Sequence, residues 1–279
     1  MTVLESFEAN PGKAPAVNLS LDSADLAETY DALSDLQFGN GRQLVAELGI
    51  QKGQRVLDVG AGTGRLAEHV ASIVGDPALV AGIDPLPLRI ALAKRRLGPR
   101  AELVVGVAED LSKFGSQSFD HVYFNAVYHW LPDQPAALRE AARVLKRGGR
   151  LGITTGDRER SNQVQRITEK VLSKPPFADI PVRDWLPYRV SVPTLKHQLH
   201  DAGLTPRAFS VRQFTDYFAS AKEVLAFSAS SSFGNFLREL PPKRVGAIRA
   251  EIVAQLEELR TQHGIPLERH TIFAVAEKI

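Results

Sequence analysis

Three glycines spaced two residues apart, Gly60, Gly62 and Gly64, separate a short apolar run from an amphipathic segment. Residues 56–59 have the composition of a buried strand, and residues 65–70 have the pattern that opens a helix. Because glycine has no side chain, backbone N–H groups in such a turn can approach a ligand closely. The partial positive charge at the start of the helix favours an anionic group on that ligand. The spacing therefore predicts a strand–turn–helix unit that binds a small molecule.

The glycine spacing differs from the dinucleotide fingerprint, in which the third glycine follows the second by three residues. In this chain Arg65 occupies that position, and Asp58 lies two residues before Gly60, which is unusual for a nicotinamide site. A glycine-rich turn after a strand is often only a turn, so the ligand has to be inferred from the strands that follow. A nicotinamide-dependent oxidoreductase is disfavoured.

Three further apolar runs end in polar residues: residues 79–83 lead to Asp84, residues 103–107 to Ala108 and Glu109, and residues 121–124 to Asn125. Open α/β sheets bind ligands at the carboxyl ends of their parallel strands, so we expect these groups to meet beside the glycine loop. Asp84 stands where a carboxylate can accept hydrogen bonds from two ribose hydroxyls. The alternative role for Asp84 is a helix N-cap, and the alternative for Glu109 is a solvated loop position.

Five motifs in this order resemble those of class I S-adenosylmethionine-dependent methyltransferases, most closely the UbiE or type 11 subgroup. They lie at residues 56–64, 82–84, 108–111, 118–122 and 145–150. The resemblance covers about residues 25–155. It implies an α/β fold with a Rossmann-like, seven-stranded, mostly parallel sheet and helices on both faces. An antiparallel last strand and helical cap insertions are part of the same expectation.

The resemblance also implies how individual residues bind S-adenosyl-L-methionine, which would leave as S-adenosyl-L-homocysteine. The glycine loop would face the methionine part, Asp84 the ribose, and Pro85 and Leu86 the adenine. Glu109 and the backbone of Ala108 would bind the adenine amino group, and Asn125 would lie below the reacting methyl. Asp58 is expected to support the loop, and residues 30–38 resemble the segment that closes over the cofactor. The predicted cofactor-binding set is Tyr30, Gln37, Asp58, Gly60, Ala61, Gly62, Asp84, Pro85, Leu86, Ala108, Glu109 and Asn125.

The chain divides into three predicted parts. Residues 1–50 are expected to form an N-terminal tail and a helical lid over the cofactor, and residues 51–156 the Rossmann-like core. Residues 157–279 hold cap insertions and the last two strands, which are predicted at residues 204–214 and 271–277.

The two insertions, residues 157–200 and 217–266, reach the open edge of the sheet and are expected to select the substrate. The aromatic residues in and near them predict an apolar or aromatic small-molecule acceptor. These residues are Trp130, Trp185, Tyr188, Phe218, Phe227, Phe233 and Phe236. The alternative is that they fill the core of the cap.

Methyl transfer from a sulfonium is an in-line displacement, and positioning alone supplies much of its acceleration. An acidic acceptor also needs a base. His129 is the first candidate, because it follows the fourth strand and histidine titrates in the useful range; the alternative is a structural histidine. Tyr30, Tyr128 and His200 are weaker candidates. His197 and His200 have helical spacing but lack a carboxylate that would complete a metal site, so no metal is predicted.

Composition sets wider bounds. The 279 residues carry a net charge of +2 and include no cysteine, which excludes disulfides and thiolate chemistry. No apolar run approaches the roughly 20 residues that span a bilayer, and no secretory signal is evident, so a cytoplasmic protein is expected. The densest basic cluster, residues 89–100, reads as the solvated face of a helix, so nucleic acid is not an expected partner. The sequence leaves the oligomeric state open.

The predicted function is methyl transfer to oxygen or carbon of a small molecule. The alternatives are an N-methyltransferase, a biosynthetic cyclase that binds the cofactor, and a non-catalytic protein that binds S-adenosylmethionine.

Overall fold

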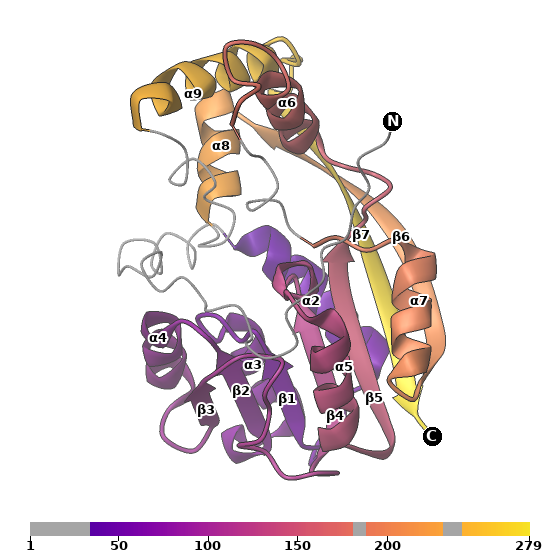
Figure 1. Cartoon of the computed structure of the whole chain (residues 1–279). Helices are drawn as coiled ribbons and strands as arrows, with labels where there is room; N and C mark the ends of the chain where they lie inside the picture. Colours follow the sequence, from indigo (N-terminus) through magenta and orange to yellow (C-terminus); the bar gives the residue numbers. More distant parts are fainter. Residues whose placement is uncertain (1–33, 181–187, 231–241) are drawn as a thin grey trace.

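The computed structural model describes residues 34–180, 188–230 and 242–279 (Figure 1). The predicted tail and Tyr30 therefore lie outside the described residues, as do Trp185, Phe233 and Phe236. No helix in the described ranges is long and apolar enough to cross a membrane.

A seven-stranded sheet with the order β3-β2-β1-β4-β5-β7-β6 forms the centre of the fold. The strands are β1 (Val56–Val59), β2 (Val80–Asp84), β3 (Glu102–Val105), β4 (Phe119–Asn125), β5 (Leu145–Gly156), β6 (Leu204–Phe218) and β7 (Ile265–Lys278). The first five strands pair in parallel, and β7 runs antiparallel to both β5 and β6. The predicted Rossmann-like sheet with an antiparallel last strand is confirmed.

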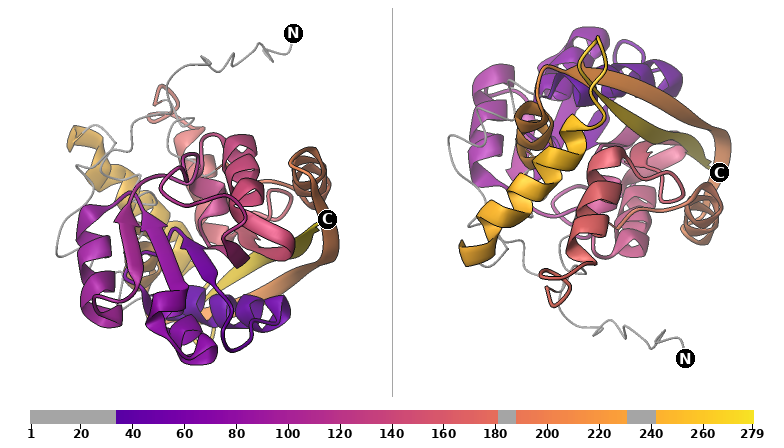
Figure 2. Two further views of the ribbon diagram at one scale, coloured as in Figure 1. Left: turned by 90° about the horizontal axis from the view of Figure 1, so that it is seen from below. Right: turned by 90° about the horizontal axis from the view of Figure 1, so that it is seen from above.

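Two layers of helices cover the sheet (Figure 2). The helices of one layer, α2 (Asp35–Leu48), α3 (Arg65–Val74) and α4 (Pro87–Leu97), share a buried cluster with β1, β2 and β7. The helices of the other, α5 (Gln134–Val144) and α7 (Val192–Asp201), pack against the opposite face. Strands β1 and β2 are buried along their whole length, because helices cover both of their faces.

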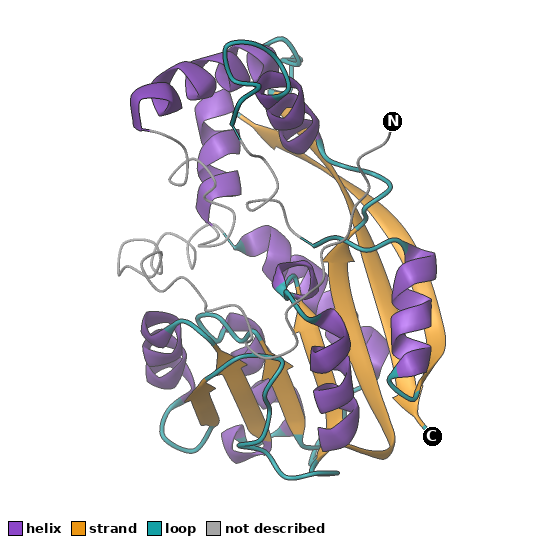
Figure 3. Ribbon diagram, in the orientation of Figure 1, coloured by secondary structure: helices purple, strands orange, loops and turns teal. Residues whose placement is uncertain are grey.

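A third cluster lies beyond the carboxyl ends of the parallel strands. It joins α6 (Gln163–Leu172), α8 (Ala221–Ser230) and α9 (Pro242–Glu257) to the far ends of β6 and β7 (Figure 3). Phe218 and Phe227 pack on each other within it, with ring centroids 5.6 Å apart. These two aromatics therefore fill the core of the cap, as the alternative for them predicted.

The last two strands are longer than predicted, so the predicted insertion 217–266 begins and ends within strands. The extra pairs carry polar residues that obscure the apolar pattern of a strand. An ion pair across the two strands, from Arg269 to Asp216 at 2.8 Å, offsets the cost of placing them there.

Helix α2 differs from the predicted lid. Its residues Leu44, Val45 and Leu48 are buried in the cluster that it shares with β1 and β7. Residues 35–48 therefore belong to the helical layer of the sheet, because their apolar side chains are covered by strands rather than by a ligand. The remainder of the predicted lid lies outside the described residues.

The contact between α2 and β5 depends on Gly152. A Cβ atom at Gly152 would lie 2.9 Å from Leu48 Cδ1 and 3.1 Å from Leu44 Cδ1, both in the buried core. The absence of a side chain at this position lets the helix approach the strand closely.

We expect Gly152→Ala to lower the free energy of unfolding by about 1–3 kcal/mol, because the added methyl overpacks a filled core. Gly246→Ala is the matched control: Gly246 lies in α9 with nothing within 4 Å of its would-be Cβ. Alanine there should stabilise the protein by up to about 1 kcal/mol through its helix propensity. Urea unfolding would measure both, and an unchanged midpoint for Gly152→Ala would contradict the close approach.

Candidate functional site

The glycine loop, residues 60–64, connects β1 to α3 at the carboxyl edge of the sheet. Gly60, Gly62 and Gly64 have φ values of +81°, +53° and +82°, a region that favours glycine. The N–H groups of Gly60 and Ala61 both donate to the carbonyl of Ile83 on β2, at 2.7 and 3.0 Å. A Cβ at Gly60 would lie 2.2 Å from Val127 Cγ2. Both the φ angle and the space require glycine at position 60.

Asp84, at the end of β2, connects this loop to the next helix. Its Oδ2 accepts from the N–H of Gly62 at 2.9 Å, and its Oδ1 accepts from the N–H of Leu86 at 3.0 Å. Only 5% of the residue is exposed. The structure therefore places Asp84 beside the loop, as predicted. The N-cap of α4 is Leu86, with no side-chain cap hydrogen bond, so the alternative of a helix N-cap role for Asp84 is wrong.

Asp58 and Tyr123 form a buried pair between β1 and β4. The hydroxyl of Tyr123 donates to Asp58 Oδ2 at 2.7 Å, and Asp58 is 2% exposed. Burial raises the pKa of Asp58 to about 7; the bond from Tyr123 opposes this rise, and the negative charge of Asp84 adds to it. Burial and the neighbouring Asp58 likewise raise the pKa of Tyr123. Asp58 lies just before the loop with its carboxyl group bound to Tyr123.

Asn125 joins three elements at the same edge. Its Oδ1 accepts from the Thr154 hydroxyl at 2.7 Å, and its Nδ2 donates to the backbone carbonyl of Gln37 at 3.0 Å. The ends of β4 and β5 and the first turn of α2 thus meet at Asn125. The side-chain Oε1 of Gln37 is buried and has no hydrogen-bond partner among the residues that the structure describes.

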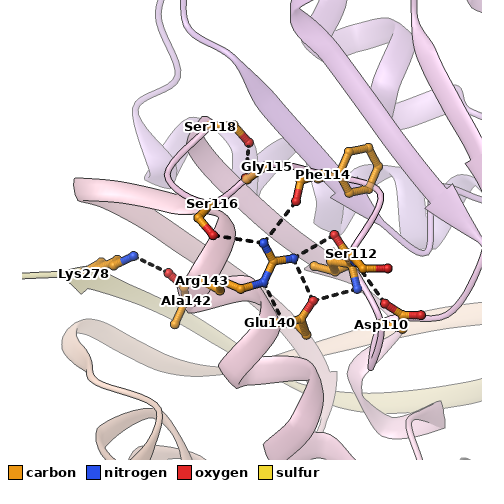
Figure 4. Close-up of polar contacts among 11 residues, drawn as sticks. Asp110, Ser112, Phe114, Gly115, Ser116, Ser118, Glu140, Ala142, Arg143 and Lys278 are labelled. Atoms are coloured by element: carbon orange, nitrogen blue, oxygen red, sulfur yellow. Dashed lines mark hydrogen bonds and ion pairs between the residues drawn. The ribbon is translucent and has the colours of Figure 1, made fainter.

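The loop that carries Ala108 and Glu109 is fixed by Arg143 of α5 (Figure 4). The guanidinium donates to the carbonyls of Leu111 and Phe114 at 2.8 and 3.1 Å and pairs with Glu140 at 2.8 Å. Glu140 in turn accepts from the N–H of Leu111 at 2.9 Å. This network holds the segment after β3 against α5.

The residues predicted around the adenine follow β2 and β3. Pro85 is half-buried, and Leu86 is only 1% exposed. Ala108 is buried, and Glu109 is half-buried with a long contact of 3.5 Å from the N–H of Asp133 to its Oε1. Burial raises the pKa of Glu109, and hydrogen bonds from its own N–H and that of Asp133 partly oppose the rise.

His129 lies on a short helix after β4, η3 (Tyr128–Trp130), with its Nδ1 3.1 Å from the hydroxyl of Thr155. Burial, with a further contribution from the positive charge of Arg189, lowers the pKa of His129 to about 3. The expectation that His129 titrates in the neutral range is therefore wrong in this environment, because the charged imidazolium would be desolvated beside another cation. His129 is a neutral imidazole at physiological pH.

The weaker candidates lie elsewhere. Tyr128 is fully buried, donates its hydroxyl to Gln198 Oε1 of α7 at 2.8 Å, and has a pKa raised by burial. His197 and His200 are exposed on α7, 3.3 and 3.8 Å from Asp201. Within the described ranges, no group of three or more potential ligands is placed to hold a metal ion.

Thr154, Thr155, Tyr123 and Arg189 belong to this site but were missed in the sequence. The two threonines end an apolar strand with no distinguishing motif. Arg189 reaches the edge only because Val190 pairs with Asp157 in an isolated bridge. No spacing in the sequence signals that pairing.

The buried carboxyl of Asp58 makes the unfolding free energy depend on pH. The pKa of Asp58 rises from 3.8 in the unfolded chain to about 7 in the folded protein, so the folded protein binds its proton more tightly. The contribution of this proton to the free energy of unfolding is fully present below about pH 4 and is lost as the pH rises through 7. Three pH units correspond to about 4 kcal/mol. We expect Asp58→Asn, which keeps an acceptor for Tyr123, to remove this loss.

Urea unfolding of wild type and variant from pH 5 to 8 would measure the difference. Subtracting the free energy of unfolding of the variant from that of wild type at each pH isolates the effect of Asp58. It removes the effects of His129 and His121, whose lowered pKa values make the stability rise with pH instead. Asp120→Asn is the control: burial raises the pKa of Asp120, but the hydrogen bonds from Lys146 and the N–H of Arg55, with the charges of Lys146 and His121, together lower it below its ordinary value. Its titration should leave this window unchanged. Parallel curves for wild type and Asp58→Asn would refute the elevated pKa.

Comparisons with known proteins match this chain to methyltransferases. Residues 57–153 match a methyltransferase domain family. The chain is 34% identical over 162 residues to an uncharacterized methyltransferase of Mycobacterium tuberculosis, covering 56% of this chain and 61% of that protein. It is 35% identical over 136 residues to the ubiquinone/menaquinone biosynthesis C-methyltransferase UbiE of Vibrio campbellii, covering 45% of this chain and 52% of that protein. A bifunctional biotin biosynthesis protein of Cellvibrio japonicus is 35% identical over 130 residues, which cover 46% of this chain but only 25% of that protein.

Solved structures agree on the fold. A putative methyltransferase of Bacillus halodurans superposes with a TM-score of 0.59 at 18% identity, covering 86% of this chain and 99% of that one. Geranyl diphosphate C-methyltransferase of Streptomyces coelicolor gives 0.53 at 15% identity, covering 86% and 77%. The chain thus spans between a quarter and about three-fifths of the curated relatives described here. Residues 57–153 thus match a methyltransferase domain family, and the relatives and the shared sheet support the class I S-adenosylmethionine-dependent methyltransferase family for this chain.

Proposed function

We propose that this protein binds S-adenosyl-L-methionine and transfers its methyl group to oxygen or carbon of a small molecule, releasing S-adenosyl-L-homocysteine. The observation that carries the proposal is the carboxyl edge of the sheet. There a loop with no room for a side chain at Gly60 or Gly64, the buried carboxylate of Asp84 bound to that loop, and the Asn125 amide at the end of β4 lie on neighbouring elements. The match of residues 57–153 to a methyltransferase domain family supports the same cofactor.

The residues at this edge fit the proposed cofactor in chemical type. Among the described residues the buried Oε1 of Gln37 has no hydrogen-bond donor, and such an acceptor suits the ammonium group of the methionine part. The carboxylate of Asp84 is the kind of acceptor that ribose hydroxyls require. Gly60 leaves room for close backbone approach. In the same proposal Ala61, Gly62 and Asn125 line the methionine part, Pro85 and Leu86 the adenine, and Ala108 and Glu109 its amino group.

The bound cofactor would supply a methyl group already activated by the sulfonium. The protein then has to hold the acceptor in line with that methyl and exclude water, which can supply much of the acceleration. Neutral His129, tied to Thr155, suits the positioning of an acceptor better than removal of its proton near pH 7. Trp130, half-buried with its ring centroid 5.0 Å from that of His129, provides an apolar surface beside it.

The first test is a thermal-shift titration with S-adenosylmethionine, S-adenosylhomocysteine and NAD in parallel. Ligand at about a hundred times its dissociation constant adds about 2.7 kcal/mol, which should raise the melting temperature by about 5–10 °C. We expect a shift with the two sulfur nucleotides alone. A shift with NAD only, or none with either sulfur nucleotide, would refute the proposed cofactor. Binding without methyl transfer to any acceptor would indicate a cyclase or a non-catalytic protein.

Asp84→Asn tests the ribose assignment. Asparagine keeps one acceptor for the backbone but loses the charge and one carboxylate oxygen, so the affinity for S-adenosylhomocysteine should fall more than tenfold, about 1.4 kcal/mol. Isothermal titration would measure it. Asp76→Asn is the control, because Asp76 also accepts from a backbone N–H but lies at the opposite end of β2. An affinity within about twofold of wild type would contradict the role of Asp84.

The pH dependence of turnover tests His129. Since its pKa is about 3, kcat should show no inflection from this residue between pH 5 and 8. His129→Gln, which can keep a hydrogen bond to Thr155, should retain at least about a tenth of kcat. A wild-type inflection between pH 6 and 7 that disappears in the variant, with a loss of more than about 100-fold, would instead identify His129 as a general base.

A further inference from the structure

Arg189 is a half-buried cation that forms no ion pair with the residues the structure describes. Its guanidinium makes one hydrogen bond, from Nη1 to the hydroxyl of Ser161 at 3.3 Å. In the part of the chain that the structure describes, no carboxylate oxygen lies within 4.0 Å of it. A guanidinium has five donors, so most of its hydrogen-bonding capacity is unused. Removing such a group from water without a partner is costly.

The two acidic residues whose charges act on Arg189, Asp157 and Glu169, do not form an ion pair with it. Asp157 is buried, but its Oδ2 pairs with Arg160 at 2.7 Å and its Oδ1 accepts from the N–H of Glu159 at 3.0 Å. Glu169 is exposed on α6 and forms no ion pair with Arg189. Burial lowers the pKa of Arg189, and the charges of Glu169 and Asp157 act against that decrease without reaching contact distance.

The segment that carries Arg189 is fixed to the reaction edge of the sheet. The N–H of Tyr188 donates to the carbonyl of His129 at 2.7 Å, and the carbonyl of Tyr188 accepts from Gln134 Nε2 at 2.6 Å. The aliphatic part of Arg189 lies against Gly156, where a Cβ would be 3.1 Å from Arg189 Cδ. Gly156 follows Thr155, the partner of His129. Arg189 therefore lies at the carboxyl end of β5, next to the elements that carry Asn125 and His129.

We infer that Arg189 binds a carboxylate of the methyl acceptor, and that the acceptor is a small carboxylic acid with an apolar body. The inference rests on the proposed function, because it assigns a substrate class to the same site. A guanidinium fork matches a carboxylate with two parallel hydrogen bonds. The neighbouring cation Arg160 already pairs with Asp157 at 2.7 Å. Tyr188, a residue that is 56% exposed, directly precedes Arg189 and donates its N–H to the carbonyl of His129, which the half-buried Trp130 follows. These two aromatic side chains suit the apolar body.

The test is methyl transfer from S-adenosylmethionine carrying a labelled methyl group, with small aromatic and aliphatic carboxylic acids and the matching neutral amides as acceptors. Wild type should accept acids and discriminate against their amides by about tenfold or more, the effect of losing a hydrogen bond to a charged group. Equal use of acids and amides, or the use of neutral acceptors alone, would overturn the inference. So would a panel in which no acid is methylated.

Two substitutions separate charge from geometry. Arg189→Gln should raise KM for the acid by about 10- to 100-fold, and Arg189→Lys, which keeps the charge but not the fork, should have a smaller effect. Arg207→Gln removes the same charge from an exposed pair with Glu277 at the opposite end of the sheet, and should leave KM unchanged. An unchanged KM in both Arg189 variants would overturn the inference.

Binding of S-adenosylhomocysteine, measured by titration in every variant, distinguishes two kinds of failure. If wild type does not bind it, the proposed function fails. If wild type and Arg189→Gln bind it equally but acids show no advantage, only the substrate assignment fails. Should Arg189→Gln fail to fold, Arg189→Lys and the acid-against-amide comparison in wild type still decide the matter.

Discussion

Asp84 accepts hydrogen bonds from the N–H groups of Gly62 and Leu86, and in this way joins the loop after β1 to the helix after β2. The backbone adds two bonds from the same loop to Ile83. Together they determine where the open amides and carbonyls of the site point. Three of the five residues of the loop 60–64 are glycines, so few side chains restrict its conformation. Hydrogen bonds to Ile83 and Asp84 of the neighbouring strand β2 fix it instead. Every other part of the site is arranged around this connection.

The cost of this arrangement is a set of polar groups in the interior. Asp58, Tyr123 and Thr154 are all buried among apolar strands. Asp58 and Tyr123 bind each other, and the Thr154 hydroxyl donates to Asn125 and accepts from the N–H of Ala126. Such bonds are strong in a low-dielectric interior and expensive to leave unmade. Gln37 Oε1 and the guanidinium of Arg189 break the pattern, since their hydrogen-bonding capacity is largely unused in the described protein.

The helices of the cap pack on the ends of two strands of the central sheet. Strands β6 and β7 run past the edge of the parallel strands and carry α6, α8 and α9 on their far ends. Arg212 of β6 connects the two strands to α2. Its guanidinium lies 4.0 Å from the ring centroid of Phe273 on β7 and pairs with Glu47 of α2. Movement of the cap would therefore involve the same long strands that pair with β5. The same two strands, β5 and β7, thus connect the cap to the part of the sheet that carries Asn125.

The sequence by itself determined the sheet and the order of its strand-end groups. Glycines with positive φ, apolar runs of strand length and a polar residue after each run are local signals, and local sterics and burial decide them. The structure places Gly60, Asp84 and Asn125 at one edge as expected, because parallel strands must end together. Only the tertiary structure decided that residues 35–48 are a core helix, that β6 and β7 extend into the cap, and that His129 is a weak base. It alone brought Arg189 to the end of β5. Burial, neighbouring charge and pairing between residues far apart in the chain decide these properties, and none of them is a function of sequence spacing.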